Sequence, residues 1–448
     1  MALAIFVGAF AMPLRRIMAL VLILAPFELI NSHYGTSSTG LVYLAALALW
    51  VRGGLPRLPL GGAVMGILFV YLLSLALAEA RPLDHVIYLI RILPGFLIFY
   101  MAYNYAREGE DQKGIMNVFL VVNLIVLGLS LLQLAGGSQQ VSLFGIEEFS
   151  LMKNRESQGR INGPFGAEFT SEYLALMSLF LAYLLMQKSR DTAWPRWGLW
   201  ALLAGNLAIM VATGSRGGFL VLLAGVLWGG FLFRRVLGAG RALAILLVTA
   251  LVATAMAWVV IRYTHYNVLF ERLEGTEIKS GVIDSRSVTW PTAWEAIKKH
   301  PILGYGPRLR LWNDKEEPIP GHDPIPYPHS LPLFLLYTLG AVGLLAYLVF
   351  FGRLLIRFHQ GTRLRDDGRA AGFARLGLLL LTLFLLDEIK IEFLRFIRSD
   401  YQAIVFTLFG ALLAMSEPRQ GQGTASPMTK TSPRQRLLHS SQTPGGDK

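Results

Sequence analysis

The 448-residue chain contains no cysteine, and only 16% of its residues are charged. The absence of thiols excludes disulfides, thiolate nucleophiles and cysteine metal sites. The sequence also lacks a GxxxxGK(S/T) nucleotide loop, an HExxH zinc motif and any Asp-x-Asp pair that could hold a divalent cation under a diphosphate. We therefore expect neither a metal nor another cofactor, and arginine side chains would have to neutralise any phosphate group that the protein binds.

Hydrophobic residues, in contrast, make up 54% of the chain, and the mean hydropathy is +0.50. A helix needs roughly 20 apolar residues to cross a membrane, and the long runs here do not alternate as strands would. The sequence therefore predicts an all-α, polytopic membrane protein with about 12 transmembrane helices. The apolar runs lie at about 15–31, 40–52, 62–79, 86–105, 114–135, 171–187, 196–213, 217–233, 242–262, 331–352, 371–388 and 400–415.

The basic residues, which give a formal net charge of +12, follow a pattern along the chain. Arg and Lys gather in alternate short loops such as 52–57 and 353–369, whereas the intervening loops 32–39 and 80–85 contain only Arg81. Because the cytoplasmic loops of membrane proteins carry the positive charge, both termini are expected in the cytoplasm. The same bias accounts for most of the basic excess, so no nucleic-acid partner is expected.

The chain is expected to form one membrane domain, residues 1–415, followed by a disordered cytoplasmic tail, residues 416–448, that is rich in Ser, Gln, Gly, Pro and Thr. In this topology two long segments, about 136–170 and 263–330, lie on the outer side of the membrane. The second segment contains an amphipathic pattern at 290–299 with Trp and Ile on one face. This pattern predicts a helix that lies on the membrane surface.

A tight connection, Gly214-Ser215-Arg216-Gly217-Gly218, joins two apolar runs on the outer side. An arginine so close to hydrocarbon is costly unless it meets an anion, and the glycines would let a phosphate approach the backbone and the start of the next helix. The alternative is an arginine that extends from a helix end to the lipid headgroups. The local sequence alone leaves both interpretations open.

His329 immediately precedes an apolar run on the same side of the membrane. A neutral imidazole can take a proton from a hydroxyl group near neutral pH, and at a helix entrance it can reach both water and lipid. The alternative is a histidine that caps the helix or lies at the interface. His300 and His322, in the same outer segment, are rivals for the role of a base.

Four further arginines on this side are candidates for binding a phosphate group: Arg286, Arg160, Arg155 and Arg91. A lone arginine in a polar loop is usually solvated or ion-paired. Arg91 differs because it lies inside an apolar run, where burial without an anionic partner would cost several kcal/mol. Together with Arg216 and His329, these residues indicate an enzyme that handles a phosphate-bearing lipid.

Four motifs follow one another within residues 150–350: Arg160 with Gly163 and Phe165, Gly-Ser-Arg-Gly-Gly at 214–218, Arg286 with Trp294 and Pro301-x-x-Gly-x-Gly, and His329 with Gly340 and Gly343. In this order they resemble the O-antigen ligase family, whose superfamily also holds O-antigen polymerases and bacterial protein O-oligosaccharyltransferases. The chain departs from the family pattern at two places. Ser330 follows the histidine where the family often has Asn, and residues 166–169 lack the usual Pro-Asn pair.

The resemblance implies a single transmembrane catalytic domain of GT-C-like glycosyltransferase architecture, with a large helical periplasmic loop, in the inner membrane of a Gram-negative bacterium. It implies transfer of O-antigen polysaccharide from undecaprenyl diphosphate to a sugar hydroxyl of lipid A-core, with inversion and without metal or ATP. The donor, the acceptor and membrane lipids are then the partners. The implied site residues are His329 as general base, Arg216 and Arg286 as catalytic residues that bind the diphosphate, and Arg160, Arg155 and Arg91 as further diphosphate-binding residues.

Two kinds of alternative stay open. An O-antigen polymerase or a protein O-oligosaccharyltransferase would share the lipid-linked donor and differ in the acceptor. A lipid or solute transporter could also have about 12 spans, but transporters usually place their ionisable residues near the bilayer midplane, within repeated halves. The candidates here gather at one interface, and no half-repeat is apparent, so the sequence favours an enzyme.

Overall fold

Helices make up nearly all of the regular structure. The computed structural model describes residues 12–27, 31–32, 35–51, 57–77, 82–107, 112–136, 161–187, 192–237, 286–307, 328–364, 368–391 and 399–417, together with the single residues 240, 254, 258 and 394. The helices are α2 (Leu14–Leu24), α3 (Ser37–Val51), α4 (Gly61–Leu77), α5 (Pro82–Arg107), α6 (Gln112–Gly136), α7 (Ala167–Met186), α8 (Arg196–Thr213), α9 (Arg216–Leu237), α12 (Arg286–Ile297), α13 (Leu331–Gly361), α14 (Gly368–Asp387) and α15 (Ser399–Ser416). Within these described residues the only strands are the two-residue β1 (Asn31–Ser32) and β2 (Gly35–Thr36), which pair antiparallel.

The predicted all-α membrane fold is confirmed. Among the described residues, seven helices are long and apolar enough to cross a membrane, and three shorter apolar helices, Thr39–Val51, Gly61–Leu77 and Tyr401–Ser416, accompany them. Each predicted apolar run overlaps a helix, except 242–262, which lies almost wholly outside the described residues. The predicted count of about 12 spans stays a prediction. The predicted tail, 416–448, also lies outside the described residues from Pro418 onwards.

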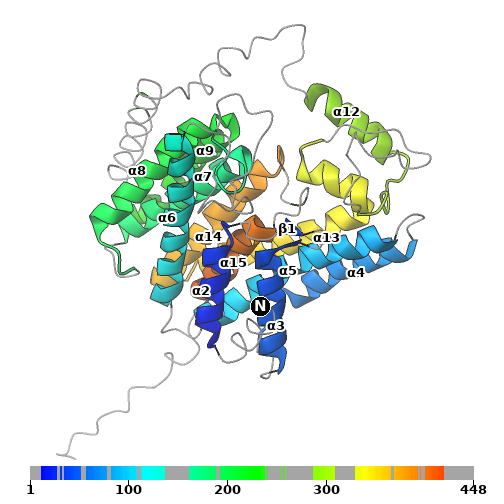
Figure 1. Cartoon of the computed structure of the whole chain (residues 1–448), viewed down its shortest axis with the longest axis horizontal. Coiled ribbons are helices and arrows are strands. Elements are labelled where there is room, and N and C mark those ends of the chain that lie inside the picture. The colour runs from blue at the N-terminus through cyan, green and yellow to red at the C-terminus, as the bar shows by residue number, and fades with distance from the viewer. Residues whose placement is uncertain are drawn as a thin grey trace, which may run out of the picture. The chain divides into compact units, whose positions relative to one another are not determined.

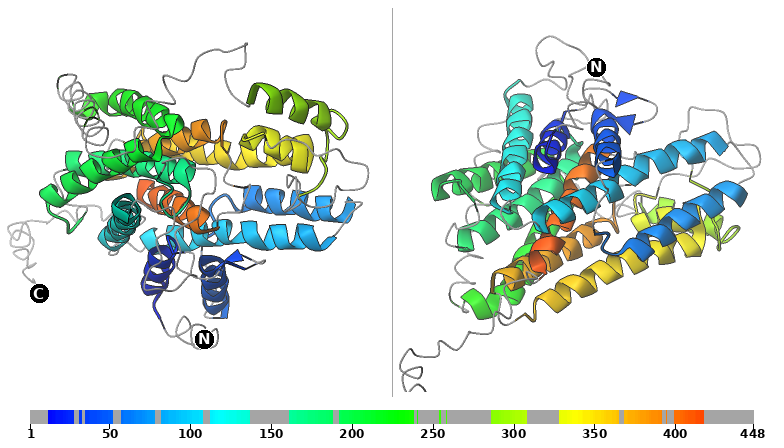
Figure 2. Two further views of the ribbon diagram at one scale, coloured as in Figure 1. Left: turned by 45° about the horizontal axis from the view of Figure 1, so that its top comes forward. Right: turned by 90° about the horizontal axis from the view of Figure 1, so that it is seen from below.

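The helices α14 and α15 lie between the other helices and contact several of them (Figure 1). α15 packs along α5, while α14 contacts α7, α9, α13 and α15 (Figure 2). Between α5, α13 and α15 the rings of Phe96, Phe350 and Phe406 meet, with Phe96 edge-on to the other two at centroid distances of 5.5 and 5.6 Å. Such pairs stabilise a core beyond the apolar area that they bury.

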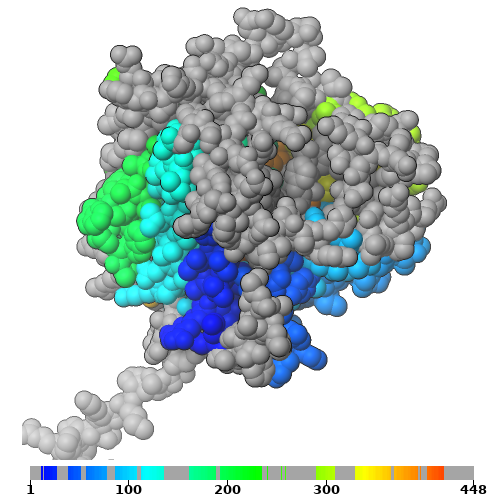
Figure 3. Space-filling model, in the orientation of Figure 1, coloured from blue at the N-terminus to red at the C-terminus, as the bar shows by residue number. Residues whose placement is uncertain are grey.

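Several helices expose large apolar side chains at the molecular surface. Figure 3 shows α6 on one face between α8 and α2, which both pack against it. On α6 and α8, the side chains of Leu124, Leu132, Trp197 and Trp200 are between 47% and 76% exposed. Water would solvate such surfaces poorly, whereas lipid tails solvate them well. The protein is a multi-pass membrane protein.

The longest helix, α13, has 31 residues and is interrupted at Gly340. We call the end at which it begins the His329 end, and the end at which it finishes the Glu417 end. α14 runs back along α13, so its last residues return to the His329 end. There the backbone N–H of Leu331 donates a hydrogen bond to the carbonyl oxygen of Glu388 over 2.8 Å.

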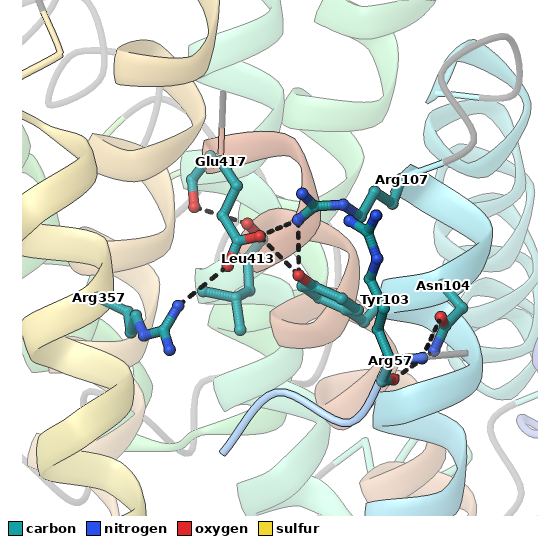
Figure 4. Close-up of polar contacts among 8 residues, drawn as sticks. Arg57, Tyr103, Asn104, Arg107, Arg357, Leu413 and Glu417 are labelled. Carbon is teal, nitrogen blue, oxygen red and sulfur yellow. Dashed lines mark hydrogen bonds and ion pairs between the residues drawn. The ribbon is translucent and has the colours of Figure 1, made fainter. Parts of the chain in front are cut away.

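At the Glu417 end, one carboxylate joins three helices (Figure 4). Glu417, which follows α15, forms ion pairs with Arg107 at the end of α5 and, over 3.4 Å, with Arg357 near the end of α13. The hydroxyl of Tyr103 also donates to Glu417, over 2.5 Å. The carboxylate therefore ties the ends of α5, α13 and α15 together.

Candidate active site

The predicted site residues differ in how far the structure describes them. His329, Arg216 and Arg91 lie within the described residues. Arg286 is described as the first residue of α12, without its side chain, and Arg155 and Arg160 lie outside the described residues. Of the rival histidines, His300 is described and His322 is not. We therefore locate Arg286 by its backbone, and Arg160 only by the chain that follows it.

The predicted hairpin is present between α8 and α9. α8 ends at Thr213, Gly214 takes the left-handed conformation at φ +62°, and Arg216 is the first residue of α9. The side chain of Arg216 is half-buried. A helix N-terminus presents backbone N–H groups and a partial positive charge, so this position favours an anion.

The glycines of the hairpin allow close packing against two other segments. A Cβ on Gly218 would overlap the hydroxyl of Ser171 in α7, and a Cβ on Gly217 would overlap the ammonium nitrogen of Lys390. The hairpin therefore lies directly against α7 and against Lys390, which follows α14. The ammonium group of Lys390 thus lies against the residue that follows Arg216.

The segment after Arg160 also packs beside this hairpin. The N–H of Ile161 donates to the carbonyl oxygen of Ala212 over 3.1 Å, close to the end of α8. The N–H groups of Asn162 and Gly163 both donate to the side-chain oxygen of Gln133, at 3.0 and 2.9 Å. Gly163 has φ +58°, a conformation that glycine adopts without strain. The described chain thus resumes, directly after Arg160, next to the hairpin that carries Arg216.

His329 itself has an unusual backbone. Its φ is +46°, and it is one of two non-glycine residues with positive φ in the described part of the chain. Such a conformation costs about 1–3 kcal/mol and persists only where the surrounding structure enforces it. Pro328 and Ser330 on either side are buried, while His329 is half-buried. The imidazole therefore belongs to a short segment that its neighbours hold in place.

Two hydrogen bonds hold this segment, one on each side of His329. After it, Leu331 donates to the carbonyl oxygen of Glu388, as described above. Before it, the indole N–H of Trp290 in α12 donates to the carbonyl oxygen of Pro328 over 2.7 Å. α12 begins at Arg286, about one helical turn before Trp290. The backbone of Arg286 therefore lies close to the segment that carries His329.

α12 and the chain that follows it are held in place at a break in α13. Gly340 has φ +66° and ψ −167°, which interrupts the helix. The Pro301–Gly306 segment fills the gap with four backbone hydrogen bonds: Tyr305 N–H to Tyr337 at 2.8 Å, Gly306 N–H to Thr338 at 2.8 Å, Ala341 N–H to Pro301 at 2.9 Å and Val342 N–H to Ile302 at 3.3 Å. The segment thereby satisfies backbone groups that the break would otherwise leave without partners. We call residues 301–306 the plug.

The contact between the plug and α13 requires glycine at two positions. A Cβ on Gly340 would overlap the carbonyl group of Ile302, and a Cβ on Gly304 would lie 2.6 Å from the carbonyl oxygen of Tyr337. The hydroxyl of Tyr305 donates to the carbonyl oxygen of Ala296 over 3.0 Å, and burial raises the pKa of that hydroxyl, which keeps it a donor. Pro-x-x-Gly-x-Gly is thus a structural motif that docks α12 onto α13.

α12 covers most of the stretch 290–299, for which a helix was predicted, but Trp294 and Ile297, which were predicted to share one face, differ in their surroundings. The predicted position on the membrane surface stays a prediction. Ala293, Ala296 and Ile297 are buried, whereas Trp294 is 47% exposed. The buried face packs on α13, where Ala296 and Ile297 form a small apolar cluster with Tyr337. Small side chains allow this close approach of two helices, which a tryptophan would prevent.

A buried polar cluster lies beneath the hairpin. Glu172 in α7 has no exposed surface, and Asp387 and Glu388 are each 1% exposed. Lys390 forms an ion pair with Asp387 and, as described above, lies against Gly217. Glu172 could have been noticed as an acidic residue within the apolar run 171–187, because ionisable residues inside membrane spans are expensive and usually functional.

Arg91 lies in α5, half-buried, beside the same end of the bundle. One turn before it, the hydroxyl of Tyr88 donates to the carbonyl oxygen of Leu394 over 3.2 Å, and the ring of Tyr88 stacks on Phe334 of α13 at 6.4 Å. Arg91 therefore belongs to the helix that borders the start of α13 and the connection after α14. Its role in binding a phosphate group stays a prediction.

His300 has a different setting from His329. Its carbonyl oxygen accepts a hydrogen bond from Gly304 over 3.1 Å, and its ring meets the ring of Tyr305 edge-on at 4.5 Å. It thus packs against the plug, beyond α12 in the chain. Among the described histidines, His329 is the one that is connected to both α12 and the hairpin through the contacts described above. Within the described residues no group of three His, Asp or Glu side chains is arranged to hold a metal ion.

Comparison with known proteins adds one finding. Residues 199–348 match the family model described as O-antigen ligase. The matched range includes the hairpin, α12, the plug, His329 and the break at Gly340. No curated protein matches the chain.

Proposed function

We propose that this membrane protein transfers O-antigen polysaccharide from undecaprenyl diphosphate to a sugar hydroxyl of lipid A-core, because residues 199–348 match the family model described as O-antigen ligase. The observation that supports this most is the chain of contacts at the His329 end. His329 connects through Leu331 and Glu388 to the region of Lys390, and Lys390 lies against the glycine that follows Arg216. A base and fixed cations at one end of a membrane bundle suit a lipid-linked diphosphate.

In the proposed reaction, His329 takes the proton of the acceptor hydroxyl. The hydroxyl oxygen attacks the anomeric carbon of the donor sugar and forms the new glycosidic bond, while the bond from that carbon to the diphosphate oxygen breaks. The electron pair leaves with undecaprenyl diphosphate. Attack opposite the leaving group inverts the anomeric centre, and the reaction takes its energy from the donor's own diphosphate linkage.

The leaving diphosphate gains negative charge as its bond breaks, so cations that are already in place stabilise the transition state. We assign this role to Arg216 at the start of α9 and to Arg286 at the start of α12. Arginine suits it, because its planar guanidinium remains charged and binds two phosphate oxygens at once. We propose that Arg160, Arg155 and Arg91 assist in holding the donor.

Expression of the chain in a ligase-deficient Gram-negative strain tests the proposal. We expect lipopolysaccharide gels to show a polymer ladder attached to lipid A-core, where the uncomplemented strain shows core alone. A strain that makes donor and acceptor normally and still lacks the ladder would contradict ligation. Polymer that only lengthens on its lipid carrier would indicate a polymerase, and polymer that appears on protein would indicate protein glycosylation.

A further inference from the structure

We propose that Trp290 is a positioning residue, whose indole N–H holds His329 in its strained backbone conformation by donating to the carbonyl oxygen of Pro328. This inference rests on the proposed function, since it concerns the geometry of the proposed base. Trp290 itself touches neither the hydroxyl nor the diphosphate in this scheme; it acts through His329.

The hydrogen bond from Trp290 matters because it reaches the carbonyl oxygen of Pro328. Pro328 is buried, and a buried carbonyl oxygen without a donor is costly. The Trp290 hydrogen bond, at 2.7 Å, supplies a donor from a separate helix. Because the peptide group between Pro328 and His329 is planar, holding this carbonyl also limits the φ rotation of His329. The indole therefore acts on the torsion angle that is strained.

The other side of His329 has its own anchor, the 2.8 Å hydrogen bond from Leu331 to Glu388. With both sides held, the backbone at His329 stays at φ +46°, which a histidine free to relax would leave for negative φ. Such a rotation would swing the imidazole away from its present direction. Removal of one anchor thus lowers the fraction of molecules with the base in position.

Trp290 is not needed to attach α12 to the rest of the protein. The other end of α12 is fixed by the cluster of Ala296 and Ile297 with Tyr337, and by the plug in the break of α13. Loss of a single N–H group at position 290 should therefore leave α12 docked. This separation allows the positioning role to be tested apart from folding.

The sharpest test replaces Trp290 by benzothienylalanine, which keeps the size of the ring system and replaces the N–H by sulfur. Ligation is measured with purified protein in lipid, undecaprenyl-diphosphate-linked O-antigen as donor and lipid A-core as acceptor. We expect kcat to fall about fivefold to tenfold, the effect of one lost buried hydrogen bond, with the KM for the donor unchanged. The melting temperature should fall by about 2 °C or less, because the Pro328 carbonyl loses its donor. Trp290→Phe should give the same result, and Trp197→Phe, at a side chain that is 76% exposed, should change nothing.

A second measurement separates positioning from a general structural role. The benzothienylalanine replacement is combined with His329→Asn, which removes the base. If Trp290 acts through His329, the replacement has no further effect in that background. An equal fall in kcat with and without His329, or a wild-type kcat at position 290, would overturn the inference while leaving the proposed function intact. A wild-type protein that forms no ligated product would overturn the proposed function, and this inference with it.

Discussion

The two ends of the helix bundle hold their charged groups in different ways. At the Glu417 end, a carboxylate, two arginines and a tyrosine pair with one another through their side chains (Figure 4). At the His329 end Lys390 also pairs with Asp387, but there backbone hydrogen bonds and close glycine contacts bring separate segments together, and one of these segments carries a strained histidine. At the Glu417 end, the charged groups therefore find their partners within the protein.

The two arrangements have different consequences. The ion pairs at the Glu417 end stabilise the fold, whereas the strained segment at the His329 end holds a side chain in position for the proposed chemistry. A partly buried ion pair lowers the free energy of the folded state modestly, and nothing else need bind there. Strain such as that at His329 raises the free energy of the folded state, and it is found most often at functional sites. The comparison therefore predicts that substitutions at the His329 end change activity, whereas substitutions at the Glu417 end change stability.

The largest effect is expected from His329→Asn. Asparagine tolerates a positive φ, so the backbone can keep its conformation, but its amide cannot accept the proton of a hydroxyl. We expect the ligation rate to fall by about 10² to 10⁴-fold, with donor binding nearly unchanged. Steady-state rates and binding of undecaprenyl diphosphate measure the two quantities. A variant with more than half of the wild-type rate would show that His329 only orients the acceptor.

A smaller but still severe effect is expected from Gly340→Ala, which tests whether the plug organises the His329 end. The new Cβ would overlap Ile302 and force a positive φ on alanine, so we expect destabilisation by about 3 kcal/mol and a partial fall in the ligation rate. Gly352→Ala in the same helix is the matched control, because a Cβ there meets nothing within 4 Å. That variant should melt at the wild-type temperature or above, since alanine favours helix over glycine. Equal melting temperatures of the two variants would contradict the role of the plug.

The contrast between the ends also shows what the sequence can predict. The membrane helices followed from apolar runs, and the start of α8 and the end of α7 agree with them closely. α13 was predicted to finish at 352 and continues to Gly361. The reason is that Arg353 and Arg357 mark where the helix leaves hydrocarbon, while its backbone hydrogen bonds continue beyond that boundary.

The site was predictable in its residue types but not in its connections. Gly214–Gly218 and His329 stood out, because cations, glycines and a titratable side chain occur at helix ends. The contacts from Lys390 to Gly217, and from Trp290 to Pro328, join segments far apart in the chain, and no local pattern encodes them. The break at Gly340 was hidden for the same reason: a glycine in an apolar run is compatible with an intact helix until another segment inserts.

The smallest effect is expected from Glu417→Gln, which tests the opposite end. Neutralising this carboxylate removes the charge that Arg107 and Arg357 share, and their side chains remain partly exposed to solvent, at 20% and 51%. We expect a loss of about 1 kcal/mol, seen as a melting temperature a few degrees lower, with kcat unchanged. Glu295→Gln breaks an exposed pair with Lys298 and serves as the control for stability, with no measurable change in melting. If Glu417→Gln instead lowered kcat without lowering the melting temperature, the Glu417 end would take part in turnover, because an ion pair that only joins helices changes stability and leaves the proton transfer at the other end untouched.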